Sequence, residues 1–157
     1  MGVLRSGPFP RIALRDLEGA MRPVEETWSA GDALILVGKR DCKTTRQTIP
    51  FVDRIERRRA RDHGVLVVLQ DDAETARTLA ADLKLQTPVR LDEDPYPLVA
   101  ALALEAVPTL FLVDRTGEIV KTTEAFHRAD LEEYAGRLGV TGPLFTAADK
   151  APAMKPG

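Results

Sequence analysis

The 157-residue chain is long enough for one filled hydrophobic core and too short for two, so we expect a single domain. Its 22 basic and 24 acidic side chains nearly cancel, and a net charge of -2 excludes a global field that recruits nucleic acid or an anionic membrane surface. No apolar run reaches the roughly 20 residues of a membrane helix. A single cysteine and the missing secretion signal predict a cytoplasmic protein.

The N-terminal quarter predicts an edge hairpin, a short helix and a buried strand. Polar and apolar residues alternate over 11–15, and a turn follows at 16–19. Residues 23–29 predict a short helix. The continuous apolar run 33–38 is typical of a strand with both faces covered, so we expect it at the centre of a sheet.

A helix and a second buried strand come next. Apolar residues recur at helical spacing from Lys43 to about His63, and Pro50 kinks this helix. Gly64 ends it, and residues 65–69 form another continuous apolar run. The pair Asp71-Asp72 then caps a further helix. Strand, helix, strand and helix in this order indicate a parallel βαβ unit with a right-handed crossover.

The C-terminal half predicts shorter elements. They are a strand at 89–91, a brief helix at 97–104, a hairpin of strands 109–113 and 118–122, and a last helix at 130–138. Beyond Gly139 the composition shifts to Pro, Gly, Ala and Thr, which favours disorder. We therefore expect a domain over residues 8–139 and a flexible tail over 140–157.

Cys42 lies between the predicted strand 33–38 and the start of the following helix. Val107-Pro108-Thr109 precedes the last hairpin. This order of elements, with Pro50 eight residues after Cys42, resembles the thioredoxin superfamily. Within it, the chain is most similar to the redoxins that act as thiol-disulfide oxidoreductases in cytochrome maturation. The resemblance implies an α/β thioredoxin-like fold, with a central mixed β-sheet flanked by helices and an N-terminal β-hairpin extension.

The resemblance also implies the site residues. Members carry Trp-Cys-x-x-Cys, and residues 41–45 read Asp-Cys-Lys-Thr-Thr here. Cys42 thus takes the attacking position, while Thr45 stands where the resolving cysteine would be. Val107-Pro108 is expected to be a cis peptide with Pro108 facing the thiol. The substrate-binding residues implied are Val107, Pro108, Asp41 and Lys43.

The position of Cys42 predicts an activated thiol. Free N–H groups and the helix dipole favour a thiolate at a helix N-terminus. Basic side chains between Lys39 and Arg46 act in the same direction, and Asp41 opposes them. Thr45 would donate its hydroxyl to the thiolate but cannot resolve a mixed disulfide. We therefore expect a monothiol mechanism, in which Cys42 attacks a disulfide and an external thiol regenerates it.

Two other interpretations stay open. A redox-inactive binding module would keep the groove beside Pro108 to dock a peptide or a protein, and Cys42 would then be only a small retained residue. A one-cysteine peroxidase also needs a single thiol. Its motif, however, places Thr or Ser where this chain has Lys39, and residues 105–109 offer no Arg to polarise a peroxide.

The remaining candidate features predict no further chemistry. Basic residues between Arg54 and Arg61 are interleaved with acidic ones, which favours an ion-paired surface over a nucleic-acid site. His63 and His127 lack metal-ligand spacing, so we expect no metal and no cofactor, and a copper site shared with Cys42 is poorly supported. The expected partners are a disulfide-bearing protein or small-thiol mixed disulfide and an external thiol reductant, without nucleic acid or membrane.

Overall fold

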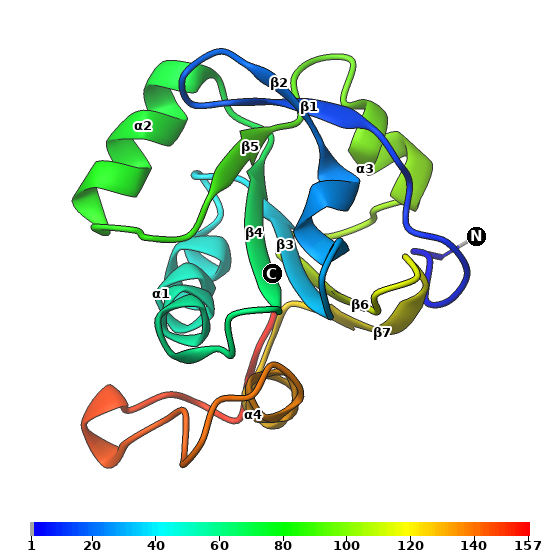
Figure 1. The fold of residues 1–157 in the computed structure, drawn as a ribbon. Coiled ribbons are helices and arrows are strands. Elements are labelled where there is room, and N and C mark those ends of the chain that lie inside the picture. The colour runs from blue at the N-terminus through cyan, green and yellow to red at the C-terminus, as the bar shows by residue number, and fades with distance from the viewer. Residues whose placement is uncertain (1) are drawn as a thin grey trace.

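A computed structural model describes residues 2–157. Seven strands form one sheet: β1 (Ala13–Asp16), β2 (Met21–Pro23), β3 (Ala33–Gly38), β4 (Gly64–Leu69), β5 (Val89–Leu91), β6 (Thr109–Val113) and β7 (Ile119–Glu124). Their order is β2-β1-β5-β4-β3-β6-β7 (Figure 1). The strands β3, β4 and β5 are parallel to one another, and the other neighbours are antiparallel. The mixed sheet with an N-terminal hairpin is thereby confirmed.

Helices cover both faces of this sheet (Figure 1). One face packs against α1 (Lys43–Arg58), α2 (Ala73–Asp82) and α4 (Arg128–Arg137). The other packs against η1 (Val24–Trp28) and α3 (Pro97–Leu102). Side chains of a strand alternate between faces, so Leu34 and Leu36 enter the first cluster and Ile35 enters the second. The continuous apolar run of β3 is therefore explained by two cores.

The helix α1 begins where the sequence predicts but ends earlier, at Arg58 rather than near His63. Arg59 is extended, and the next N–H, that of Ala60, donates to Leu138 O at the end of α4 (2.9 Å). A contact between two helix ends thus replaces the last predicted turn. Pro50 lies inside α1, as predicted.

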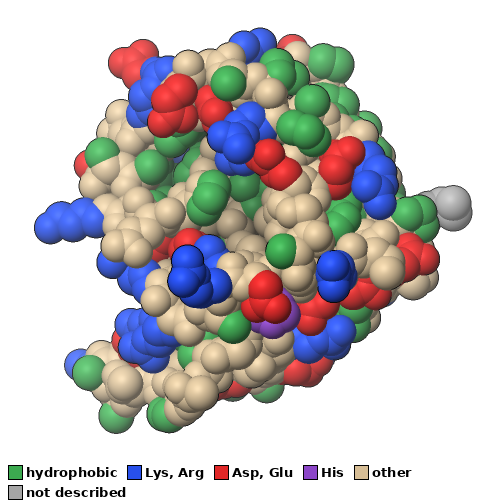
Figure 2. Space-filling model, in the orientation of Figure 1, with side chains coloured by type: hydrophobic (Ala, Val, Ile, Leu, Met, Phe, Trp, Pro, Cys, Tyr) green, Lys and Arg blue, Asp and Glu red, His purple; other side chains and the backbone are tan. Residues whose placement is uncertain are grey.

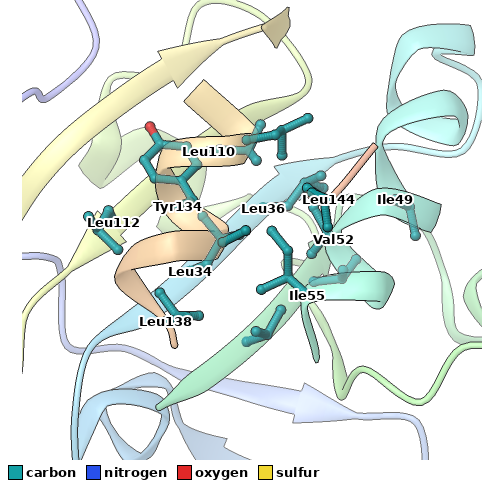
Figure 3. Close-up of a cluster of buried hydrophobic side chains, with 14 of the residues drawn as sticks. Leu34, Leu36, Ile49, Val52, Ile55, Leu110, Leu112, Tyr134, Leu138 and Leu144 are labelled. Atoms are coloured by element: carbon teal, nitrogen blue, oxygen red, sulfur yellow. The ribbon is translucent and has the colours of Figure 1, made fainter. Parts of the chain in front are cut away.

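The segment after α4 differs from the flexible tail that its composition predicts. It contains η2 (Ala147–Asp149) and β9 (Met154–Lys155), and β9 pairs antiparallel with β8 (Phe126–His127). Leu144 and Phe145 are buried. Figure 3 shows Leu144 beside Leu36 and Val52 in the first core cluster. Val140, Leu144 and Phe145 show no helical or strand periodicity in the sequence, so composition alone predicts a flexible segment over 140–157 where the structure packs three apolar side chains.

Charges of both signs are interspersed on the surface seen in Figure 2. Arg57 on α1 pairs with Asp53, and Arg59 just after α1 pairs with Glu56, each at 2.7 to 2.8 Å, as the interleaved sequence predicts. Arg54 pairs instead with Asp149 of the C-terminal segment, at 2.8 Å. Within residues 2–157, no helix is both long and apolar enough to cross a membrane.

Asp53 joins α1 to the segment before β5. Its carboxylate is 5% exposed and accepts the N–H groups of Gln86 and Thr87, the hydroxyl of Thr87 and the guanidinium of Arg57. Burial alone would raise the pKa of Asp53, but the hydrogen bonds from Thr87 and Arg57 outweigh it and lower that pKa. The ionised carboxylate therefore stabilises the fold above the usual Asp pKa, and this contribution is lost as pH falls through the lowered value.

We expect Asp53→Asn to lower the free energy of unfolding by about 2 kcal/mol at pH 7, because it removes charge-assisted hydrogen bonds. The gap from the wild type should shrink as the pH is brought below the usual Asp pKa. Urea unfolding at a series of pH values measures both effects. Asp62→Asn is the matched control, since that side chain is 64% exposed. A gap that widens in acid would contradict the assignment.

Candidate active site

The sheet topology brings two loops together at one end of β3. Strands β3 and β6 are antiparallel, with Val37 opposite Thr109. The end of β3 therefore lies beside the beginning of β6. Cys42 follows β3 after a short turn, and Pro108 immediately precedes β6. The peptide bond between Val107 and Pro108 is cis, as the resemblance implied.

Cys42 is the N-cap residue of α1, with an extended backbone at φ -78° and ψ 117°. Its sulfur accepts the N–H of Thr45 at 3.4 Å, and its S–H donates to Val107 O, also at 3.4 Å. The side chain is half-buried. The first N–H groups of a helix have no partner inside the helix, so a thiolate at this position receives both a hydrogen bond and the positive end of the dipole.

Thr45 acts on the sulfur through its backbone and not through its hydroxyl. The residue is completely buried, and within residues 2–157 its Oγ1 has no hydrogen-bond partner. Its side chain packs against Gly38, where an added Cβ would lie 2.7 Å from Thr45 Cγ2. The expected donation from the Thr45 hydroxyl to the thiolate is therefore absent from the structure. A side chain at this position is enclosed between α1 and the end of β3.

The loop before Cys42 is held by Asp71, which the sequence predicts as part of a helix cap. Asp71 Oδ2 accepts the N–H of Arg40 at 2.9 Å, while Asp72 alone caps α2 by accepting the N–H of Thr75. Burial raises the pKa of Asp71, and the charges of Asp41 and Asp72 act in the same direction against the Arg40 hydrogen bond. The parallel pairing of β3 and β4 places their carboxyl ends side by side, and that signal could have identified Asp71.

The other predicted site residues surround the thiol in different ways. Asp41 and Lys43 flank Cys42 and are exposed. Pro108 is buried, and Val107 is half-buried with its carbonyl oxygen at the sulfur. The structure thus brings Cys42, the Thr45 N–H and Val107 into direct contact. Asp41 and Lys43 line the solvent side of this site.

A cavity of about 590 Å³ lies away from Cys42, at the opposite end of β4. Two ion pairs lie in its wall: Arg90 contacts Glu26, and Arg59 contacts Glu56, each at 2.7 Å. His63, also in its wall, accepts the N–H of Asp32 through Nδ1. Across residues 2–157, no group of three or more His, Cys, Asp or Glu side chains is placed to hold a metal ion.

Comparisons with known proteins place the fold. No protein-family model and no curated protein matches the chain. Among solved structures, a protein assigned as the thiol:disulfide interchange protein DsbE from Chlorobium tepidum has a TM-score of 0.75 and 20% identity, covering 87% of this chain and 96% of its own. The thioredoxin domain of a thiol-disulfide oxidoreductase from Bacteroides vulgatus has a TM-score of 0.72 and 17% identity, covering 86% and 97%.

A third neighbour is a secreted Mycobacterium tuberculosis disulfide oxidoreductase homologous to E. coli DsbE. Its TM-score is 0.67 at 14% identity, and the match covers 82% of this chain and 94% of that one. The chain has a thioredoxin-like fold. The form of that fold is the one found in thiol:disulfide interchange proteins. The expected cytoplasmic location is contradicted by these neighbours, one of which is secreted. The expectation rested in part on the single cysteine, and a single cysteine does not indicate the compartment in which it works.

Proposed function

We propose that the protein is a monothiol thiol-disulfide oxidoreductase in which Cys42 is the nucleophile. The observation that carries this proposal is the position of the Cys42 sulfur, which receives the Thr45 N–H at the start of α1 and lies against Val107 O beside Pro108. A thiolate there is stabilised by the helix and open on its solvent side. These are the two requirements for attack on a disulfide.

The reaction needs two exchange steps. In the first, the Cys42 thiolate attacks one sulfur of a disulfide, forming a mixed disulfide with Cys42 and expelling the other sulfur as a thiolate. In the second, an external thiolate attacks the Cys42 mixed disulfide, releasing the bound half as a new disulfide and regenerating the Cys42 thiolate. One half of the substrate disulfide is thereby released as a thiol, and the other half leaves as a disulfide with the external thiol. Complete reduction of a protein disulfide needs a second external thiol, which attacks that product and is oxidised with the first. No second cysteine of this chain is consumed.

The substrates that fit are a disulfide-bearing protein or the mixed disulfide of a small thiol. Ionisation of Cys42 removes the S–H donor from Val107 O. That carbonyl then accepts an N–H from an extended substrate backbone when Gly157, which also lies against it, is displaced. Asp41 and Lys43 are exposed on the solvent side and would contact the remainder of the substrate.

A competition between two oxidants tests this function against its rivals. The protein is mixed with hydrogen peroxide or with a glutathione mixed disulfide of a reporter peptide, each with glutathione as the reductant. We expect the mixed disulfide to be consumed and the peroxide to react no faster than with free cysteine. Preferential consumption of peroxide would favour the peroxidase. Consumption of neither would leave the redox-inactive binding module as the better interpretation.

We expect Thr45→Cys to create an insulin-disulfide reductase. The new sulfur would occupy the enclosed space of the Thr45 side chain, one helical turn after Cys42, and would expel the bound substrate without an external thiol. Turbidity from reduced insulin in the presence of dithiothreitol measures the gain. Thr48→Cys is the matched control, because it adds a buried cysteine a further turn away from Cys42. Equal activity of the two variants would contradict the alignment of Thr45 with the resolving position.

A further inference from the structure

The last residues of the chain return to the candidate active site. After α4 the chain loops outward through η2 and then runs back toward the sheet, where Figure 1 shows it in red. Along this path β9 pairs with β8, with Lys155 opposite Phe126 and Met154 opposite His127. The N–H of Arg128 donates to Ala153 O at 2.9 Å. The returning segment is thus an extended strand held by its backbone.

The end of this strand reaches Thr44 and the carbonyl of Val107, which the thiol also contacts. Thr44, two residues after Cys42, donates its hydroxyl to Pro156 O at 2.5 Å. Gly157 lies so close to the loop before Pro108 that an added Cβ would come within 2.1 Å of Val107 O. The S–H of Cys42 donates to that same oxygen. Residues 154–157 therefore occupy the surface that an extended substrate would need.

The segment is firmly anchored before this point and lightly held beyond it. Leu144 is buried, and the Arg54 guanidinium donates two hydrogen bonds to the Asp149 carboxylate, at 2.8 and 3.1 Å. From Lys150 onward the side chains are exposed or half-buried, and Met154 is 53% exposed. Little apolar area holds residues 150–157 in place, so a few hydrogen bonds set the free energy of detachment.

Detachment would uncover an apolar floor. A cavity of about 350 Å³ lies between α1 and the returning segment, which lines it with residues 149–152 and Lys155. Phe51 and Phe126 line the opposite side, with their rings 5.9 Å apart. A peptide that replaced the segment would find an edge for strand pairing at β8 and an aromatic pocket for one apolar side chain.

We propose that residues 150–157 are a built-in competitor in a peptide-binding groove formed by β8, Thr44 and Val107. The partner is an extended polypeptide that pairs with β8, places a small residue at Val107 and an apolar side chain over Phe51 and Phe126. The description of this peptide as a substrate rests on the proposed function, whereas its competition with residues 150–157 does not. Tethering gives the segment an effective concentration in the millimolar range, so it suppresses weak ligands.

The test measures binding in a Cys42→Ser background, so that its result does not depend on exchange chemistry. The probe is a fluorescently labelled peptide with the sequence of residues 150–157, Lys-Ala-Pro-Ala-Met-Lys-Pro-Gly, added to the full chain. Gly157→Ala dislodges the tethered segment through the clash with Val107 O, and Lys155→Pro breaks its pairing with Phe126. We expect each variant to bind the probe about tenfold more tightly than the unsubstituted chain.

Gly136→Ala is the matched control, because an added Cβ there meets no atom within 4 Å, and it should bind the probe as weakly as the unsubstituted chain. Thr44→Val in the Lys155→Pro chain should lower the affinity for the probe about fivefold, because one hydrogen bond is lost. Equal affinity across all these chains, or no binding to any of them, would overturn the proposal. Failure of disulfide exchange with the groove test intact would instead overturn only the proposed function.

Discussion

Cys42→Ser is expected to reduce thiol-disulfide exchange to the rate without protein, because a serine hydroxyl neither ionises near neutral pH nor forms a mixed disulfide. The fold should be unaffected. Serine is among the preferred N-cap residues, and its oxygen would accept the Thr45 N–H in place of the sulfur. Exchange is measured with a fluorescent mixed-disulfide reporter, and stability by urea unfolding.

The two measurements together separate chemistry from structure. Loss of exchange with an unchanged free energy of unfolding assigns the reaction to the sulfur. Cys42→Ala is the matched comparison, since it also removes the sulfur but leaves the N-cap without an acceptor, at a cost of about 1 kcal/mol. Exchange that persists in Cys42→Ser would rule out Cys42 as the nucleophile.

Leu144→Ala is expected to lower the free energy of unfolding by about 3 kcal/mol, in the range measured for buried leucines. Leu144 is completely buried and packs in the same cluster as Leu36 and Val52. Its N–H also donates to the carboxylate of Glu132 on α4. The segment after α4 is thus part of the core, and removing this side chain leaves a cavity between α1 and the sheet.

Met154→Ala, in the same segment, is the control. That side chain is 53% exposed, so the free energy of unfolding should change by no more than about 0.5 kcal/mol. Urea unfolding of both variants gives the comparison. If Leu144→Ala were as mild as Met154→Ala, the packing of this segment against the core would be wrong, and the flexible tail expected from composition would be the better description.

Local patterns carried most of the fold. The predicted bounds of the run 33–38 are those of β3 in the structure. A strand covered on both faces is apolar throughout, so its ends are clear in the sequence. The helix after Asp72 begins where its cap predicts. Cys42 was located at the start of α1 because a strand and a helix meet there in the sequence. These features depend on neighbours along the chain, which a sequence displays directly.

Features that depend on distant contacts were missed. Arg58 ends α1 because the following residues contact the end of α4, and no local signal marks that contact. The sequence around Leu144 predicts a flexible tail, because the residues of α1 and α4 that bury this side chain are distant in the sequence. Thr45 was expected to use its hydroxyl, yet the orientation of the helix presents its N–H to the sulfur. The role of Asp71 required the pairing of β3 with β4, which brings Arg40 within reach.

The most direct test is to look for the intermediate on Cys42. The protein is mixed with the mixed disulfide of a small thiol, quenched with acid at successive times, and examined by intact-protein mass spectrometry. We expect one adduct of that thiol, located on Cys42 by peptide mapping, which disappears when a second thiol is added and yields an equal amount of small-molecule disulfide. A protein that never acquires the adduct, or that acquires one and does not release it to the second thiol, would contradict a monothiol oxidoreductase.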